Sequence, residues 1–337
     1  YFQQGAKAML NQPKQYYRQA YSIYDQLFGR HPLRADKAYI ILPDGAASSL
    51  PVDALVTQPG YSPSVESWPF VIKQTQVSYA YSLQTLKEQL LSRSAGKGFT
   101  GFFIEQNTRQ QPDLAAVVQE REGIAQTVQS GQWLINEQAT ANAFRDALDH
   151  AAVVHISTHA FAKKDSIDAP HIELYNEPFY LFELKSMQQH PAMVVLSACR
   201  TGDGRLVTGE GVQSLARAFI AGSTNAVVAG WWNVNDEAAA QLMQQFYASL
   251  SGSNHAAGAL RQAKLGWLNN KDISYLHKLP YYWAALNYYG HPSPLPDNSW
   301  MKKSGPSVQW LLLLVLPVIV LLVFFRHRII KYAAPQL

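Results

Sequence analysis

The sequence predicts an α/β domain built around a mostly parallel β-sheet, followed by one transmembrane helix near the C-terminus. Short apolar runs enriched in β-branched and aromatic residues recur along the chain, as is typical of buried strands. Segments with apolar residues at helical spacing lie between several of these runs, and this alternation favours parallel strands joined by helices. The third observation is a long uncharged apolar segment close to the C-terminal end.

The expected helices and strands alternate along most of the chain. A helix over 14–28 comes first, and its aromatic residues at helical spacing predict a stripe that packs against the main domain. We expect strands over 39–42, 71–79, 99–104, 133–135, 153–157, 193–197 and 226–231, and a final strand over 282–288. The other expected helices cover 114–128, 139–148, 181–189, 212–221 and 238–250.

Length and composition limit the class of protein. The chain has 337 residues, which is enough for one large domain or two ordinary ones. A hydrophobic fraction of 47% and a charged fraction of 15% exclude a wholly disordered or collagen-like chain. The net charge of +4 is small and the basic residues are not clustered, so we expect no nucleic-acid partner. Cys199 is the single cysteine, which excludes an intrachain disulfide.

The segment 308–325 is the expected membrane span. It contains no charged residue, and 15 of its 18 positions are Leu, Ile, Val or Phe. As a helix it would be about 27 Å long, just enough for the hydrocarbon core of a bilayer. Basic residues lie on both sides, with too small a bias to indicate an orientation. We therefore expect a single-pass C-terminal membrane anchor.

These segments predict the organisation of the chain. Residues 1–30 form a helical lead-in, or the end of a longer repeat region, and residues 31–291 form the main domain. A linker rich in proline and serine covers 292–307, ahead of the span and a short basic tail at 326–337. Because the sequence begins at Tyr1 and not at Met, we expect a preceding segment that could hold a regulatory module.

Two of the expected strands end in residues that can carry chemistry. The run V-V-H-I-S-T-H-A leads to His159, and the run V-V-L-S-A-C-R-T-G-D-G leads to Cys199 and a glycine-rich loop. In parallel sheets the reacting groups gather beyond the carboxyl ends of the strands. If the two strands are neighbours, His159 and Cys199 lie on one rim. We expect His155, on the first of these strands, to be packed in the core or to support the pair.

A thiol beside an imidazole predicts nucleophilic catalysis. A free thiol has a pKa of about 8.5, so little of it is thiolate at neutral pH. His159 could take the Cys199 proton or pair with the thiolate, and then protonate the leaving amine. The backbone N–H groups of Cys199 and of Ala160 are the expected donors to the oxyanion of the tetrahedral intermediate. This chemistry requires no cofactor.

The pattern also resembles the CHAT domain family, a caspase-like peptidase family related to separase. The resemblance covers about 39–290, and it rests on the two strand-end motifs and on four further segments in the same order. These are I-L-P-D-G-A-A-S-S-L-P-V-D-A-L at 41–55, G-E-G-V-Q-S-L-A-R-A-F at 209–219, V-V-A-G-W-W-N-V-N-D at 227–236 and Y-Y-W-A-A-L-N-Y-Y-G at 281–290. The resemblance implies a caspase-like three-layer sandwich, cleavage of peptide bonds by a His159–Cys199 dyad, and a bacterial origin.

Ala160 departs from the pattern of the family, which usually has glycine after the catalytic histidine. The backbone N–H remains as an oxyanion donor, but at a positive φ alanine would cost about 1 kcal/mol. The departure leaves an alternative function, a CHAT-like membrane scaffold that binds protein partners without cleaving them. The presence of both His159 and Cys199 favours the peptidase.

Three acidic residues are candidates for the substrate pocket. In separase-like relatives, the segment that corresponds to W-N-V-N-D, which ends at Asp236, helps to line the pocket for the residue before the scissile bond. Asp203 and Glu210, which follow Cys199, are the other two candidates. A carboxylate in this pocket favours arginine or lysine, so we expect cleavage after a basic residue. Asp236 also precedes a helical segment, and capping that helix is its alternative role.

We expect no metal site. His155 and His159 are four residues apart, but their segment is an expected strand, and Ile156 replaces the glutamate of the zinc motif H-E-x-x-H. The expected partners are a protein or peptide substrate, the membrane, and a regulatory partner or upstream repeat domain. Because a reactive thiol must stay reduced, we expect the catalytic domain on the cytoplasmic side.

Overall fold

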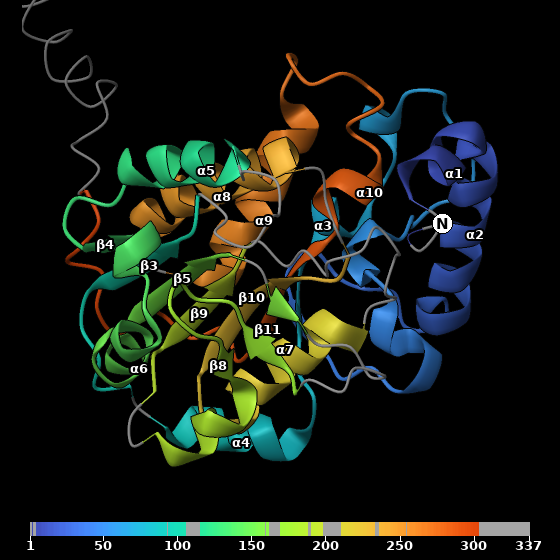
Figure 1. The fold of residues 1–337 in the computed structure, drawn as a ribbon. Coiled ribbons are helices and arrows are strands. Elements are labelled where there is room, and N and C mark those ends of the chain that lie inside the picture. The colour runs from blue at the N-terminus through green and yellow to red at the C-terminus, as the bar shows by residue number, and fades with distance from the viewer. Residues whose placement is uncertain are drawn as a thin grey trace, which may run out of the picture. The chain divides into compact units, whose positions relative to one another are not determined.

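A central sheet dominates the computed structural model, which describes residues 2, 5–92, 94–105, 115–158, 160–161, 169–187, 190–197, 210–232, 236–253 and 255–302. Within these residues the sheet has eight strands in the order β1-β2-β11-β10-β9-β5-β3-β4 (Figure 1). Every neighbouring pair is parallel except β10 and β11. The predicted mostly parallel α/β fold is therefore confirmed.

The strands follow the predicted apolar runs closely. Those of the central sheet are β1 (Ala38–Ile41), β2 (Gln76–Tyr79), β3 (Phe99–Phe103), β4 (Gln132–Ile135), β5 (Val153–Ser157), β9 (Met193–Leu196), β10 (Ala226–Gly230) and β11 (Leu286–Gly290). A small antiparallel sheet contains β6 (Ala160–Phe161), β7 (His171–Ile172) and β8 (Phe179–Tyr180).

Helices cover both faces of the central sheet, as Figure 1 shows. One face carries α5 (Ala115–Ala125), α8 (Asp236–Ser253) and α9 (Ala256–Asn269), and the other carries α6 (Ala141–His150) and α7 (Glu210–Ala221). The shorter α4 (Leu83–Leu91) contacts β11. The remaining helices are α1 (Ala6–Asn11), α2 (Pro13–Phe28), α3 (Val71–Gln74) and α10 (Pro280–Trp283), with 3₁₀ turns at Gly45–Ser49, Val52–Ala54, Val65–Ser67, Asn136–Gln138 and Leu181–Ser186.

Alternation along each strand divides the core between the two faces. On β5, Val153 belongs to the cluster under α5, α8 and α9, whereas Val154 and Ile156 belong to the cluster under α6 and α7. The same alternation holds on β9, where Val195 faces the first cluster and Leu196 the second. Side chains two residues apart on a strand point to the same face, which places His155 and Ser157 on the side of α5 and α8.

The first long helix packs its aromatic stripe as the sequence predicts. Tyr16, Tyr17 and Tyr24 of α2 are buried, and the rings of Tyr16 and Tyr17 lie 6.1 and 5.1 Å from that of Trp68. The Tyr16 hydroxyl donates to the carbonyl oxygen of Ala54 at 3.0 Å. The helix is therefore attached to the segment that joins β1 to β2.

Three sequence expectations differ from the structure. The run 71–79 is not one strand, because Val71–Gln74 forms α3 and only Gln76–Tyr79 pairs in the sheet. The expected helix over 181–189 is a 3₁₀ turn at Leu181–Ser186. The final strand begins at Leu286 rather than at 282, after the short helix α10, and runs antiparallel to β10. Short apolar runs do not distinguish a strand from a single helical turn, which explains the first difference.

The predicted membrane span at 308–325 lies outside the described residues. Within the described ranges, no helix is both long enough and apolar enough to cross a membrane.

We predict that Gly290→Ala destabilises the fold. Gly290 ends β11 at φ +115°, and a Cβ there would lie 2.3 Å from the carbonyl oxygen of Asn225. Together, the left-handed backbone and this contact with a rigid group should lower the free energy of unfolding by at least about 2 kcal/mol. Urea denaturation would measure the change.

Gly252→Ala is the matched control for this prediction. Gly252 lies in α8, and among the described residues no atom comes within 4 Å of a Cβ built there. Alanine favours a helix over glycine by up to about 1 kcal/mol, so this variant should be neutral or stabilising. Equal unfolding midpoints for Gly290→Ala and the parent would contradict the prediction.

Candidate active site

The strands that lead to the two candidate catalytic residues are neighbours in the sheet. β5 and β9 pair in parallel, and Ile156 lies opposite Leu196 at the end of the register. The N–H of Ser197 then donates to the carbonyl oxygen of Ile156 at 3.0 Å. Ser157 and Ser197 therefore come next on the same rim of the sheet, as the sequence predicts for neighbouring parallel strands.

His159, Cys199 and Asp203 lie outside the described residues. His159 follows Ser157 by two residues along the chain, and Cys199 follows Ser197 by the same number. Along the chain, each candidate is thus separated by the same number of residues from a serine at one of two adjacent strand ends.

The other three candidates are described through their backbone. Ala160 begins β6, Glu210 is the first residue of α7, and Asp236 is the first residue of α8. An acidic residue in the first turn of a helix interacts favourably with the positive end of the helix dipole. The position of Asp236 at the start of α8 is therefore compatible with both candidate roles, stabilisation of the helix terminus and recognition of the substrate.

The chain on either side of position 159 is attached to the small antiparallel sheet. The Thr158 hydroxyl donates to the carbonyl oxygen of Glu173 at 2.9 Å, and Ala160 pairs with Ile172. Ala160 thus lies in a strand, whose extended backbone alanine adopts without strain. The small sheet fixes the direction in which the chain leaves β5.

A buried carboxylate joins the ends of β5 and β9. Glu120 projects from α5, and its side chain is only 5% exposed. Its Oε2 accepts a hydrogen bond from the Ser157 hydroxyl at 2.6 Å, and its Oε1 accepts one from the Ser197 hydroxyl. The two serines belong to different strands, so one side chain bridges both strand ends.

His155 and Tyr247 extend this buried cluster toward α8. His155 is fully buried, and its Nδ1 lies 3.1 Å from the Tyr247 hydroxyl. Its Nε2 lies 3.4 Å from Glu120 Oε1, where within the described residues it makes no hydrogen bond. Burial, and then the charge of Glu120, raise the pKa of Tyr247 well above its usual value. The Tyr247 hydroxyl therefore stays protonated, and it can donate a hydrogen bond to Nδ1 of His155.

The close approach of α5 to α8 brings these groups together. A Cβ on Gly123 would lie 3.1 to 3.2 Å from side-chain atoms of Gln244, which is tighter than ordinary contact. Glycine at this position lets the two helices lie close together, so that Glu120 and Tyr247 both come close to His155.

Glu120 is the residue that our sequence analysis missed. Val117, Glu120, Ile124 and Val128 are all buried, at spacings of three and four residues. A charged residue within the apolar stripe of a helix is the signal that could have identified it, because a buried charge requires polar partners. His155, in contrast, is packed in the core, which is one of the two roles that the sequence predicts.

The aromatic residues after β10 occupy the neighbouring part of the fold. Trp231 is buried, and the partly buried Trp232 donates its indole N–H to the carbonyl oxygen of Tyr281 at 2.9 Å. β10 runs parallel to β9, so these residues follow a strand end on the same rim as Ser197. Asp236 comes four residues after Trp232.

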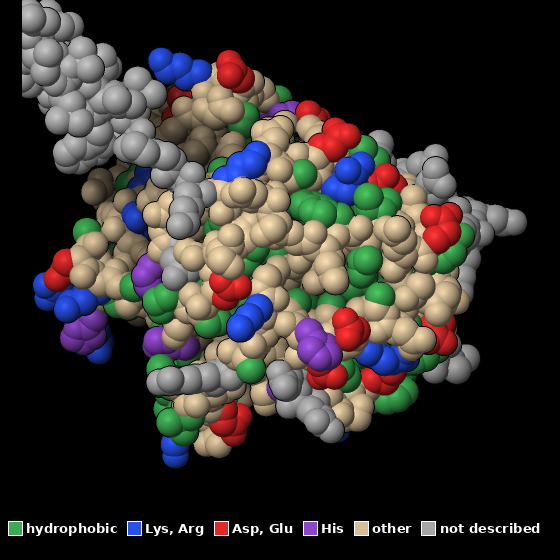
Figure 2. Space-filling view, turned by 90° about the vertical axis from the view of Figure 1, so that its left-hand side faces the viewer, with side chains coloured by type: hydrophobic (Ala, Val, Ile, Leu, Met, Phe, Trp, Pro, Cys, Tyr) green, Lys and Arg blue, Asp and Glu red, His purple; other side chains and the backbone are tan. Residues whose placement is uncertain are grey.

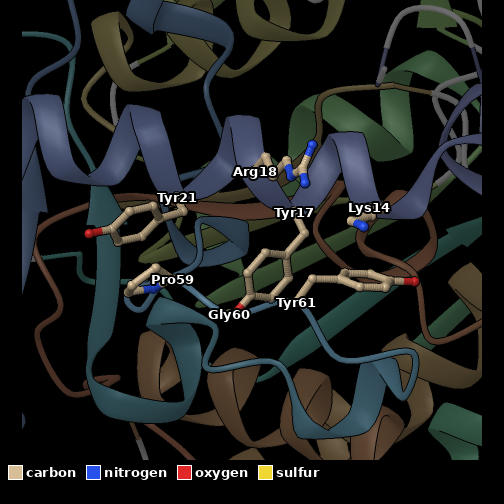
Figure 3. A pocket seen from close by; sticks show the side chains of 7 residues that line it. All are labelled: Lys14, Tyr17, Arg18, Tyr21, Pro59, Gly60 and Tyr61. Atoms are coloured by element: carbon tan, nitrogen blue, oxygen red, sulfur yellow. The ribbon is translucent and has the colours of Figure 1, made fainter.

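A separate pocket of about 550 Å³ lies between α2 and the loop at 59–61 (Figure 3). Lys14 and Arg18 line it from one side of α2, next to Tyr17 and Tyr61. The Tyr17 hydroxyl donates to the carbonyl oxygen of Gln58 at 3.0 Å. This pocket does not involve the carboxyl ends of β5 and β9, so we distinguish it from the candidate active site.

Neither the charges on the face shown in Figure 2 nor the metal-ligating residues of the described part of the chain give a further site. On the face shown in Figure 2, acidic, basic and histidine side chains are interspersed. No group of three or more His, Cys, Asp or Glu residues among the described ones is arranged to hold a metal ion.

Comparisons with known proteins give one family and several distant structures. A family model described as the CHAT domain matches residues 18–291. Tetratricopeptide repeat protein 28 of Mus musculus is 30% identical over 117 residues, which are 35% of this chain and only 5% of that protein's length.

Two solved structures illustrate the distant likeness in fold. The Arg-specific cysteine proteinase gingipain R gives a TM-score of 0.45 at 13% identity, covering 66% of this chain and 55% of that chain. The separase–securin complex of Saccharomyces cerevisiae gives 0.44 at 12% identity, covering 68% of this chain and 15% of that chain.

Proposed function

Because the chain belongs to the CHAT domain family, we propose that it is a cysteine endopeptidase with Cys199 as nucleophile and His159 as base. The observation that supports this function best is the parallel pairing of β5 with β9, in which the last register pair, Ile156 with Leu196, precedes His159 and Cys199 by the same number of residues. A parallel sheet presents the residues that follow neighbouring strands at one rim, where substrates bind.

The proposed reaction passes through an acyl-enzyme. The Cys199 sulfur attacks the scissile carbonyl carbon, and the backbone N–H groups of Cys199 and Ala160 stabilise the resulting oxyanion. The C–N bond breaks as His159 delivers the thiol proton to the leaving amine, which leaves a thioester. Water, deprotonated by His159, then hydrolyses the thioester and restores the thiol.

We predict that alkylation of Cys199 by iodoacetamide depends on His159. Cys199 is the single cysteine, so the rate reports on this thiol alone. In the parent chain, the pH profile should show an inflection well below the value of about 8.5 for a free thiol. In His159→Ala the inflection should return to about 8.5, because the thiolate has lost its imidazolium partner.

His155→Gln is the control for a general effect of losing a histidine from β5. It removes a buried imidazole from the same strand without removing the proposed base. The profile of this variant should stay close to that of the parent as long as the fold is intact. A parent profile with an inflection near 8.5, unchanged in His159→Ala, would contradict the peptidase and favour the scaffold.

We also propose that the peptidase cleaves after a basic residue. Asp236 follows β10 at the start of α8, and Asp203 and Glu210 follow Cys199 in the chain. A carboxylate recognises arginine through two charge-assisted hydrogen bonds, and lysine as a point charge. Asp236 is our first candidate for this role.

A peptide library would test this specificity. We expect hydrolysis after arginine or lysine, and we expect Asp236→Asn to reduce kcat/KM for an arginine substrate by at least about tenfold, the loss of one charge-assisted pair. Asp203→Asn and Glu210→Gln, measured in parallel, compare the other two candidates. Cleavage only after aspartate would contradict basic specificity.

A further proposal is that 308–325 anchors the chain in a membrane, with the catalytic domain on the cytoplasmic side. We predict that the full chain resists carbonate extraction from membranes and that deletion of 303–337 releases it. Leu314→Lys combined with Leu321→Lys should also release it, because each lysine near the centre of a span costs about 2.5 to 3.5 kcal/mol.

Leu83→Lys combined with Leu90→Lys, at exposed positions of α4, is the matched control and should stay in the membrane fraction. Protection of a C-terminal tag from protease in sealed cytoplasmic-side-out vesicles tests the orientation. An anchored chain with its catalytic domain protected instead would contradict the proposed topology.

A further inference from the structure

We infer that Glu120 is a positioning residue, which holds the ends of β5 and β9 in the register that His159 and Cys199 require. This inference rests on the dyad proposed above. Within the described residues, Glu120 contacts the two strand ends through the hydroxyls of Ser157 and Ser197, and we assign its effect to these contacts. Each of these serines is two residues from one member of the dyad.

The bridge begins where the backbone pairing of the two strands ends. The last register pair is Ile156 with Leu196, and the N–H of Ser197 makes the final ladder bond to Ile156. Beyond this point the serine hydroxyls continue the connection through the carboxylate of Glu120. Shear or separation of the two strand ends would break a hydrogen bond to a buried charged group, and such bonds are stronger than those between neutral groups.

The chemistry of the three side chains suits a two-strand bridge. An ionised carboxylate only accepts hydrogen bonds, and it offers two oxygens to two donors. Ser157 and Ser197 each supply one hydroxyl donor from the face of the sheet that α5 and α8 cover. A hydrophobic residue at position 120 would fill the space but leave both hydroxyls without this partner.

The described groups around Glu120 do not replace the two serines as its hydrogen-bond partners. His155 from β5 and Tyr247 from α8 form the far side of the cluster, and Tyr247 fixes the His155 ring through Nδ1. The neighbouring Arg121 is directed to Glu105, with 2.6 Å between Nε and Oε1, rather than to Glu120. Among the described Lys, Arg and His side chains, only His155 has a nitrogen within 4.0 Å of a Glu120 carboxylate oxygen, with 3.4 Å between Nε2 and Oε1. Serine hydroxyls are thus its principal partners.

Alkylation of Cys199 by iodoacetamide between pH 5 and 9.5 tests the inference on the full chain. In Ser157→Ala combined with Ser197→Ala, we expect the pKa of the Cys199 thiol to rise by at least about one unit toward that of His159→Ala, which lowers the alkylation rate by up to about tenfold per unit at a pH below both values. The amide of Glu120→Gln can accept from one serine and donate to the other, so the bridge survives without its charge. This variant should stay within about threefold of the parent, or half a pKa unit.

Ser78→Ala is the matched control. Ser78 is a buried serine on β2 whose hydroxyl donates to the carbonyl oxygen of Tyr39 at 3.3 Å, and β11 and β10 separate its strand from β9. In Ser78→Ala, the pH profile of Cys199 alkylation should equal that of the parent. Thermal unfolding of every variant shows whether it is folded at the assay temperature, and the two single serine variants replace the double one if that one is unfolded.

The outcomes separate this inference from the proposed function. A His159-dependent profile in the parent that the folded serine variants retain would overturn the inference and leave the dyad intact. A loss in Glu120→Gln as large as in the double serine variant would also overturn it, since the charge and not the bridge would then matter. A parent profile without dependence on His159 would remove the proposed function and this inference with it.

Discussion

The parallel pairing of β5 with β9 is the constraint on which the candidate site depends. These two strands lie inside the sheet, between β10 and β3, so both are buried on both faces. Their register brings Ser157 and Ser197 to one rim and sets the starting points of the chain segments that contain His159 and Cys199. The small antiparallel sheet binds the chain that follows β5. Glu120 of α5 forms hydrogen bonds to both strand ends, and Tyr247 of α8 contacts His155 on β5.

A carboxylate at the centre of this arrangement is costly unless it is well bonded. Removing a charge from water without partners costs several kcal/mol, so Glu120 must keep its hydrogen bonds to the two serines for the fold to tolerate it. The same requirement links the position of α5 to the strand ends. A purely apolar contact would stabilise the core without specifying the separation of the two ends so narrowly.

Most of the strands can be predicted from the sequence, because a strand that is buried on both faces of the sheet consists mainly of apolar residues. β9 is a continuous apolar run and β5 is an apolar run that His155 interrupts, and the two candidate catalytic residues follow the ends of those runs. The run 71–79 shows the limit of this approach, since it contains the helix α3 as well as β2. The local sequence of β11 also does not predict that it runs antiparallel to β10, because the same residues can form a parallel or an antiparallel strand.

The sequence by itself determined the α/β class, the ends of β5 and β9, and the identity of the two residues that follow them as a thiol and an imidazole. These features are local, since they depend on spacing and on side-chain chemistry within short segments. Only the tertiary structure decided that β5 and β9 are neighbours and that Glu120 joins them. Its partners Ser157 and Ser197 are 37 and 77 residues away, and chain separations of this size are closed by packing and not by local pattern.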